Sequence, residues 1–249
     1  MTRLARETRG HGTPLAFVHG FTQTRTSWEP LLGQMTTDVE AMLIDAPGHG
    51  ESGEACSLEE TAGLLCDAAA GRTLVGYSMG ARMSLVAALE CPAAFPRLVI
   101  ISGTAGLESE TERTERRDAD ARLADRIEQI GVAAFVDEWL ANPMFAGLSA
   151  ANARRSERLR NTAAGLAGSL RLAGTGTQTP LWDRLAGLSV PTLFVAGALD
   201  AKFCALAERM HSLVPGSELH VHPGVGHTVH LEDPVGCAAV IDDWLSRSQ

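Results

Sequence analysis

Short runs of apolar residues recur along the chain, and each ends where glycine, proline or polar residues begin. The runs cover residues 15–18, 41–45, 73–76, 98–101, 192–196 and 218–222. A short run bounded by turn residues is typical of a buried strand. Residues 81–90 have a helical pattern that Pro92 helps to end. Strands that alternate with helices predict an α/β fold, with a mostly parallel central sheet flanked by helices.

The strand pattern is interrupted between residues 107 and 180. This segment is helical in pattern, charged, and rich in alanine and arginine. Residues 103–106 before it and 174–177 after it contain the glycines expected of loops. A chain of 249 residues is compatible with one domain that carries an insertion. We therefore predict an α/β core of residues 1–106 and 181–249, with a helical cap inserted at 107–180.

One glycine-rich turn carries a candidate nucleophile. Residues 76–80 read Gly-Tyr-Ser-Met-Gly, which fits the pattern G-x-S-x-G between a predicted strand and a predicted helix. In the α/β-hydrolase fold this turn is the nucleophile elbow, which exposes the serine at the end of its strand. The glycines are needed because side chains there would collide with the neighbouring strand and helix. The pattern predicts Ser78 as the catalytic serine of an α/β-hydrolase fold.

A catalytic serine needs a histidine within hydrogen-bond reach, and that histidine needs a carboxylate that fixes its tautomer. In this fold the partners follow the serine in the order acid, then histidine. Asp200 follows the run at 192–196, and His227 follows the run at 218–222. Both positions belong to loops at one edge of the sheet. We therefore predict a triad of Ser78, Asp200 and His227.

The remaining histidines have structural interpretations. We expect His49 to order a loop near the pocket, and His230 to support the site or to lie at the surface. We expect solvated or edge positions for His211, His220 and His222.

Two backbone amides are candidates for the oxyanion hole. Phe21 follows the first predicted core strand, at the place that supplies one amide in this fold, and Met79 follows the serine directly. Two such donors stabilise negative charge on a carbonyl oxygen. We therefore predict that Phe21 and Met79 act through their N–H groups.

Charge narrows the class of partner. A net charge of −9 and a pI near 5.4 argue against nucleic acid and anionic membranes as partners. Arg82 lies one helical turn after Ser78, so both can face one cavity. A guanidinium matches the geometry of a carboxylate, which favours a small anionic substrate. Further arginines lie in the inserted segment, at positions 113, 116, 117, 122, 126, 154, 155, 158, 160 and 171.

The cysteine pattern and the N-terminal sequence favour a cytoplasmic protein. The cysteines are Cys56, Cys66, Cys91, Cys204 and Cys237, an odd number without a C-x-x-C pair, and we expect them to be reduced thiols. The first residues contain no apolar export signal, and no apolar run is long enough to span a membrane. No metal or organic cofactor is indicated, and we favour a monomer.

Four stretches of the predicted core, together with four in the insertion, resemble the MenH family, the 2-succinyl-6-hydroxy-2,4-cyclohexadiene-1-carboxylate (SHCHC) synthases of menaquinone biosynthesis. The core motifs are HGFT at 19–22, D-x-PGHG at 45–50, GYSMGAR at 76–82 and GHTVH-x-E-x-P at 226–234. The inserted motifs are ERR at 115–117, F-x₃-W-x₃-P-x-F at 135–145, LRN at 159–161 and GLA-x-SL at 165–170.

The resemblance implies a lyase that removes pyruvate from a cyclohexene substrate with three carboxylates, with Ser78 as the base and no cofactor. It also implies that Arg82, Arg116 and Arg160 bind carboxylates and that Tyr77 and Trp139 line the site. Arg113 and Arg117 lie close enough to Arg116 to take its place. The residues themselves leave three alternatives open. These are a serine hydrolase for carboxylate-bearing esters or carbon–carbon bonds, a haloperoxidase-like enzyme, and a binding protein without catalysis.

Overall fold

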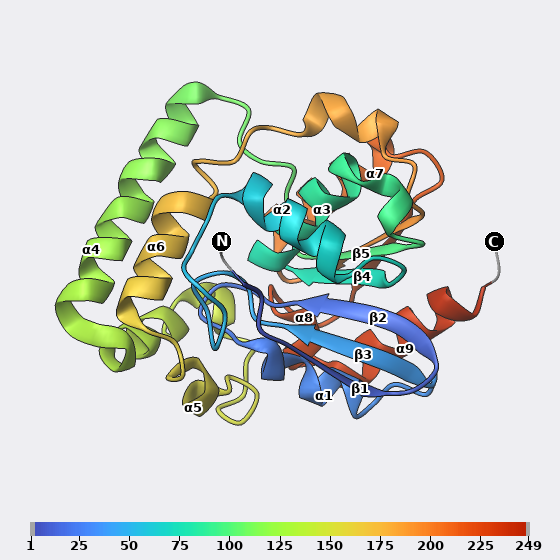
Figure 1. Cartoon of the computed structure of the whole chain (residues 1–249), viewed down its shortest axis with the longest axis horizontal. Helices are drawn as coiled ribbons and strands as arrows, with labels where there is room; N and C mark the ends of the chain where they lie inside the picture. Colours follow the sequence, from blue (N-terminus) through green and yellow to red (C-terminus); the bar gives the residue numbers. More distant parts are fainter. Residues whose placement is uncertain (1–2, 248–249) are drawn as a thin grey trace.

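The computed structural model describes residues 3–247 and contains one seven-stranded sheet in the order β1-β3-β2-β4-β5-β6-β7 (Figure 1). The six predicted core strands are confirmed and pair in parallel from β3 to β7. Their bounds are β2 Thr13–Val18, β3 Val39–Ile44, β4 Thr73–Tyr77, β5 Leu98–Ile101, β6 Thr192–Gly197 and β7 Glu218–His222. Parallel strands bring their carboxyl ends to one edge, where the candidate site lies.

The first strand, β1 (Arg6–Gly10), was absent from the sequence interpretation. It pairs antiparallel with β3 at the edge of the sheet, and all its residues are exposed. Its sequence, RETRG, has no apolar run that would predict a strand. An exposed edge strand of this kind is held by backbone hydrogen bonds rather than by burial of its side chains.

Two layers of helices cover the sheet (Figure 1). One face carries α2 (Leu58–Ala68), α3 (Met79–Glu90) and α7 (Ala201–Leu213), which share a hydrophobic cluster with the strands. The other face carries α1 (Glu29–Leu32), α8 (Val229–Glu232) and α9 (Pro234–Ser246), which share a second cluster. Strand residues alternate between the two clusters, as Val18 and Phe17 do, because successive side chains point to opposite faces.

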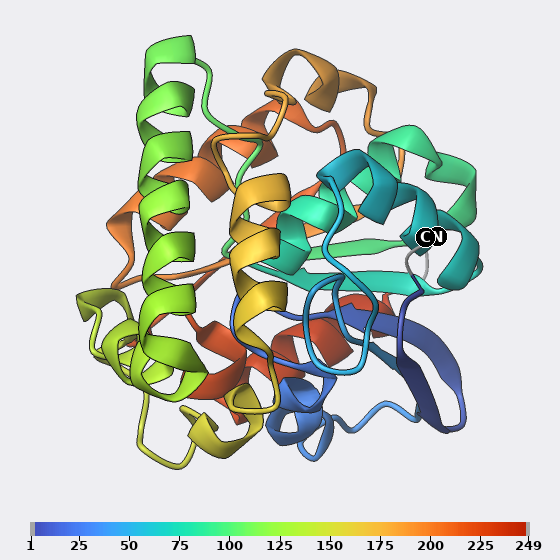
Figure 2. The ribbon, with the colours of Figure 1, turned by 60° about the vertical axis from the view of Figure 1, so that its left-hand side comes forward.

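The segment between β5 and β6 contains only helices and loops. Its helices are α4 (Glu110–Leu140), α5 (Arg155–Arg158) and α6 (Ala163–Ala173), with 3₁₀ turns at Pro143–Phe145 and Trp182–Gly187. Figures 1 and 2 show α4 and α6 side by side, and they share a third hydrophobic cluster that includes Ile127, Phe135 and Leu166. Gly131 breaks α4 with φ 77° and ψ 167°, a conformation that glycine adopts readily. The break divides α4 into two straight pieces.

The expectation of five reduced thiols is wrong for one pair. Cys66 in α2 and Cys91 at the end of α3 form a disulfide, while Cys56, Cys204 and Cys237 are free. The packing of α2 against α3 brings the two Cα atoms to 6.2 Å, which a spacing of 25 residues does not reveal. Within residues 3–247, no helix is both long and apolar enough to cross a membrane.

Candidate active site

Ser78 sits on a strained turn between β4 and α3. Its backbone has φ 52° and ψ −105°, which is unusual for a residue with a side chain. The flanking glycines permit this turn. A Cβ at Gly80 would lie 2.1 Å from the carbonyl oxygen of Val18, and one at Gly76 would lie 2.5 Å from that of Gly80. The turn therefore aims the Ser78 hydroxyl away from the sheet at its carboxyl edge.

The structure brings the three predicted triad residues together. The Nε2 atom of His227 is 3.0 Å from the Oγ of Ser78, and its Nδ1 is 2.9 Å from the Oδ2 of Asp200. Burial alone would raise the pKa of Asp200, but hydrogen bonds from His227 and from the Phe203 amide outweigh it and lower the pKa. The carboxylate is therefore charged, and His227 donates Nδ1–H to it and offers Nε2 to the serine.

Several groups hold His227 in this orientation. Glu232 accepts hydrogen bonds from the amides of Gly226 and Thr228, on either side of the histidine, at 2.7 and 2.9 Å. The hydroxyl of Ser102, on the neighbouring strand end, donates to the His227 carbonyl at 2.7 Å. The ring of Phe203 meets the imidazole edge-on at 4.4 Å. The loop is therefore fixed by its backbone as well as by its side chain.

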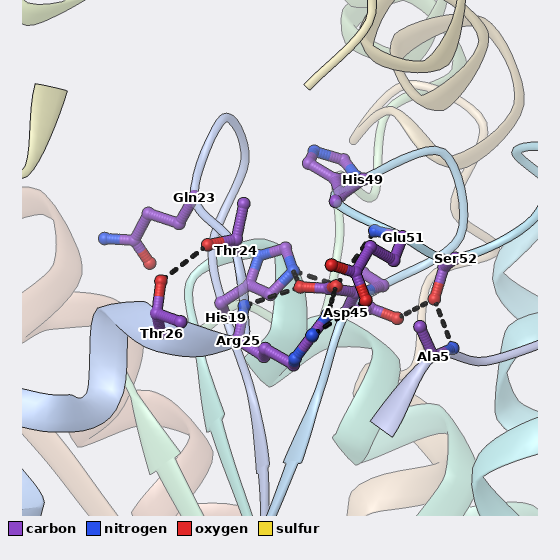
Figure 3. A network of polar contacts seen from close by, with 12 residues as sticks. Ala5, His19, Gln23, Thr24, Arg25, Thr26, Asp45, His49, Glu51 and Ser52 are labelled. Atoms are coloured by element: carbon purple, nitrogen blue, oxygen red, sulfur yellow. Dashed lines mark hydrogen bonds and ion pairs between the residues drawn. The ribbon is translucent and has the colours of Figure 1, made fainter. Parts of the chain in front are cut away.

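The loop with Phe21 is tied to the next loop through a buried polar network, shown in Figure 3. His19 donates Nδ1–H to the carbonyl of Gly20 and accepts from the Ala46 amide through Nε2. The Asp45 carboxylate accepts from both the amide and the guanidinium of Arg25. Burial opposes ionisation of Asp45, yet His19 and these donors lower its pKa. This network orders the loop that carries the Phe21 amide.

The two residues predicted to supply backbone donors, Phe21 and Met79, lie at the same cavity as Ser78 and His227. Met79 begins α3, so its N–H belongs to the first turn, whose donors have no partner within a helix. That the two amides form an oxyanion hole stays a prediction.

A cavity of about 430 Å³ opens above the serine, between the sheet edge and the helices of the inserted segment. Its wall includes the predicted residues Arg82, Arg116 and Trp139, together with Leu123 and Lys202. A volume of this size suits a small organic molecule. Three basic side chains on one wall favour an anionic one.

Arg82 is buried and already engaged. Its guanidinium donates to the carbonyls of Ala173 and Gly174, at the end of α6, and to the side chain of Gln178. Burial lowers the pKa of Arg82 to about 10. The side chain still lines the cavity, so it presents positive charge there while it holds the end of α6.

The structure distinguishes Arg116 from its neighbours. Arg113 bonds to the carbonyls of Leu107 and Glu108 and to Glu110, and Arg117 bonds to Glu110 and to the carbonyl of Gly176. Neither lines the cavity, whereas Arg116 does. Of the three alternatives, Arg116 is the one that faces the site.

The prediction for Arg160 is not met by the geometry. Arg160 is exposed and pairs with Glu51 at 2.8 Å, outside the cavity. Two residues earlier, Arg158 is buried and points inward, where it bonds to the hydroxyl of Thr22 and the carbonyl of Ala153. Its Nη2 has no hydrogen-bond partner within residues 3–247. Arg158 is the last residue of α5, whereas Arg160 lies in the turn that follows, so the two side chains leave the chain in different directions.

Arg158 lines a small cavity of about 30 Å³ next to the serine, with Gln23, Tyr77, Ser78 and His227. Tyr77 therefore lies at the site, but in this smaller cavity rather than on the main wall. Its hydroxyl is 3.2 Å from that of Thr228, and burial raises its pKa. Trp139 lines both cavities.

The remaining histidines divide into buried and edge positions. His230 is fully buried against the rings of Trp28 and Tyr77, so a surface position is wrong. His49 is buried in its loop, where Nδ1 bonds to the carbonyl of Pro47. His222 has one of the two expected positions, on the edge strand β7, and its ring is buried there, 2.9 Å from Asp233.

Sequence reasoning missed Arg158 and also Asp120, whose buried carboxylate bonds to Arg116. The spacing of four residues between Arg116 and Asp120 was a usable signal, because such pairs face each other on a helix. No comparable signal marks Arg158. Within residues 3–247, no three His, Cys, Asp or Glu side chains are grouped as metal ligands would be.

Comparison with known proteins shows the family to which the chain belongs. The alpha/beta hydrolase family matches residues 15–240, so the protein is an α/β-hydrolase by family as well as by fold. It is 37% identical over 244 residues to a putative SHCHC synthase of Bacillus subtilis, covering 92% of this chain and 89% of that one. It is 31% identical to an SHCHC synthase of Escherichia coli O1:K1, covering 94% and 96%.

The solved structures include MenH from S. aureus, which superposes with a TM-score of 0.88 at 30% identity and covers 98% of this chain and 97% of that one. The chain belongs to the family of SHCHC synthases, the MenH enzymes of menaquinone biosynthesis. The expected family and fold are confirmed.

Proposed function

We propose that the protein eliminates pyruvate from 2-succinyl-5-enolpyruvyl-6-hydroxy-3-cyclohexene-1-carboxylate and so forms SHCHC. The observation that carries the proposal is the hydrogen-bonded set of Ser78, His227 and Asp200 on the floor of a cavity with an arginine-rich wall. A triad alone serves many reactions, so the basic wall and the family are what favour this one.

The chemistry needs only proton transfer and a shift of electrons. His227 takes the proton of the Ser78 hydroxyl, and the serine oxygen removes the proton from the ring carbon next to the succinyl ketone. The electrons move through the ring double bond and break the carbon–oxygen bond to the enolpyruvyl group. The departing enolate accepts the proton held by His227 to become pyruvate, which leaves the substrate's proton on the Ser78 hydroxyl and returns the triad to its starting protonation state. No water is consumed.

Charge that develops on the ketone oxygen would be stabilised by the amides of Phe21 and Met79. The hydrogen bond from Asp200 keeps the imidazole of His227 in the tautomer that can accept a proton at Nε2. The serine is thus a base in this proposal, and no acyl-enzyme forms.

The three carboxylates of the substrate require concentrated positive charge in a protein of net charge −9. We assign their recognition to Arg82, Arg116 and Arg158, with Arg158 in place of Arg160, because these three side chains line the two cavities. Tyr77 and Trp139 complete the walls. We also propose that residues 107–180 act as a cap over the core.

A direct assay tests the function. The purified protein is supplied with the enolpyruvyl precursor, and pyruvate is followed by its reduction with lactate dehydrogenase and NADH. We expect release far above the uncatalysed rate. No excess release would refute the lyase. Hydrolysis of carboxylate-bearing aryl esters with a trapped acyl group on Ser78 would instead support the serine hydrolase.

We further propose a monomer that acts on a small anionic molecule in the cytoplasm, without nucleic-acid or membrane partners. The disulfide between Cys66 and Cys91 is unusual for that compartment. Counting free thiols in protein extracted under alkylating conditions will show whether it forms in the cell.

A further inference from the structure

Asp120 is a buried carboxylate that the proposed mechanism does not use. It lies in α4 with a relative exposure of 2%. Its Oδ1 accepts a hydrogen bond from the Nε of Arg116 at 2.9 Å, and its Oδ2 has no partner within residues 3–247. Burial of a carboxylate is costly unless a positive group compensates it. The burial of Asp120 therefore needs a physical explanation. Its hydrogen-bond partner, Arg116, lines the cavity.

Arg116 is held by one edge only. Its side chain is 40% exposed and lines the cavity, while Asp120 engages it through Nε. Within the described residues, its two terminal nitrogens make no hydrogen bond or other ion pair. A guanidinium is planar and rigid, so a bond at Nε sets the direction of the terminal nitrogens. Arg116 can therefore offer its free end to an anion.

The same carboxylate lies beside the residues that hold Arg82. A Cβ at Gly174 would lie 2.4 Å from the Oδ2 of Asp120, and the carbonyl of Gly174 accepts a hydrogen bond from Arg82. Burial is the main influence that lowers the pKa of Arg82, the charge of Arg116 lowers it further, and that of Asp120 opposes both. Two guanidiniums on one wall repel each other, and a carboxylate near both offsets that repulsion.

We propose that Asp120 is a positioning residue for substrate recognition. It directs the terminal nitrogens of Arg116 toward a carboxylate of the substrate and offsets the repulsion between the guanidiniums of Arg82 and Arg116. It does not touch the substrate. This inference rests on the proposed function for the identity of the substrate, but the geometry applies to any polycarboxylate in this cavity.

The test is a double-mutant cycle between Asp120→Asn and Arg116→Ala, read as KM and kcat for pyruvate release. Asp120→Asn keeps the shape and an acceptor oxygen but removes the charge. We expect KM to rise about tenfold with kcat changed less than about threefold, as for loss of a hydrogen bond to a charged group. In the Arg116→Ala background the same change should have little further effect on KM. Equal effects in both backgrounds would refute the inference.

Asp125→Asn is the matched control. Asp125 also lies in α4 and pairs with an arginine, Arg171, but its side chain is 73% exposed. We expect it to leave KM unchanged. A rise in KM equal to that of Asp120→Asn would indicate a general effect of charge on α4 and would contradict the positioning role.

Two measurements keep the inference separable from folding and from the proposed function. If Asp120→Asn does not fold, Arg116→Lys tests the same geometry. The lysine ammonium of this variant would be bonded to Asp120 and would have no further group directed at the substrate. We therefore expect Arg116→Lys to have the same KM as Arg116→Ala. A KM equal to that of the wild type would contradict the inference. If the wild type releases no pyruvate, calorimetric titration with tricarballylate replaces KM. Binding that Asp120→Asn weakens would support the inference although the lyase had failed, and absent or unchanged binding would overturn it.

Discussion

The floor and the wall of the cavity are built in different ways. The floor consists of loops at the carboxyl ends of β4, β6 and β7, and the backbone around His227 is held by Ser102 and Glu232. The wall consists of helices whose charged residues mostly pair at the surface, as Arg126 does with Glu138 and Arg155 with Asp137. Exposed pairs of this kind contribute little stability.

The difference separates catalysis from recognition. A base must stay within hydrogen-bond distance of the proton that it moves, which a rigid sheet edge ensures. A wall that binds carboxylates needs charge and a suitable volume, and helices that pack through a small apolar cluster can supply both. Changes in the floor should therefore affect kcat, and changes in the wall should affect KM.

The largest expected effect is in the floor. Ser78→Ala removes the proposed base without altering the turn, and we expect kcat for pyruvate release to fall by about a thousandfold, within the usual range for a general base. Thermal unfolding should show an intact fold. Ser84→Ala, which changes another buried serine of α3, is the control and should retain activity. An active Ser78→Ala variant would remove the serine from the mechanism.

A smaller effect should separate the buried Arg158 from the exposed Arg160. We expect Arg158→Met to lower kcat/KM by about 10- to 100-fold, as for loss of a hydrogen bond to a charged group. Arg160→Met removes an exposed ion pair and should change kcat/KM by less than about threefold. Both are measured by pyruvate release, with thermal unfolding as a check on Arg158→Met. The reverse order would restore Arg160 as the substrate residue.

The smallest expected effect is on the free energy of unfolding at acidic pH, which we attribute to buried histidines. Burial lowers the pKa of His19 and that of His230, and it lowers the pKa of His49 to about 3. The unfolded chain therefore takes up protons first as pH falls below about 6.5. Each of these histidines then costs up to about 1.4 kcal/mol of stability per pH unit, until its folded pKa is reached.

Urea unfolding at pH 7, 6 and 5 measures this dependence. His230→Phe keeps an aromatic ring against Trp28 and Tyr77 but cannot take up a proton, so we expect stability to fall less steeply with acid than in the wild type. His11→Phe changes an exposed histidine and should keep the wild-type slope. Equal slopes in all three proteins would place the acid sensitivity elsewhere.

The floor was largely predictable from the sequence because its determinants are local. An apolar run, a G-x-S-x-G turn and a helix placed Ser78, and strand ends placed Asp200 and His227. The wall was less predictable because a helical side chain faces inward or outward according to its phase and packing. Packing also decides the positions next to a helix end. Arg158, the last residue of α5, is buried and Arg160 in the following turn is exposed, and nothing in residues 158–161 tells which arginine is buried. The exposed strand β1 and the disulfide likewise depend on neighbours distant in sequence.

Gly131 divides α4, a helix of the cavity wall, into two parts. It separates a highly charged half of α4, with Arg116 and Asp120, from a half with the aromatic residues Phe135 and Trp139. In an unbroken helix, one inserted residue would rotate everything beyond it by about 100° and would spoil both faces together. Because Gly131 interrupts the helix, the direction of the side chains after it does not depend on the helical rotation of the residues before it. Substitutions or insertions after the glycine can therefore reshape the half with Phe135 and Trp139 while the half with Arg116 and Asp120 keeps its orientation.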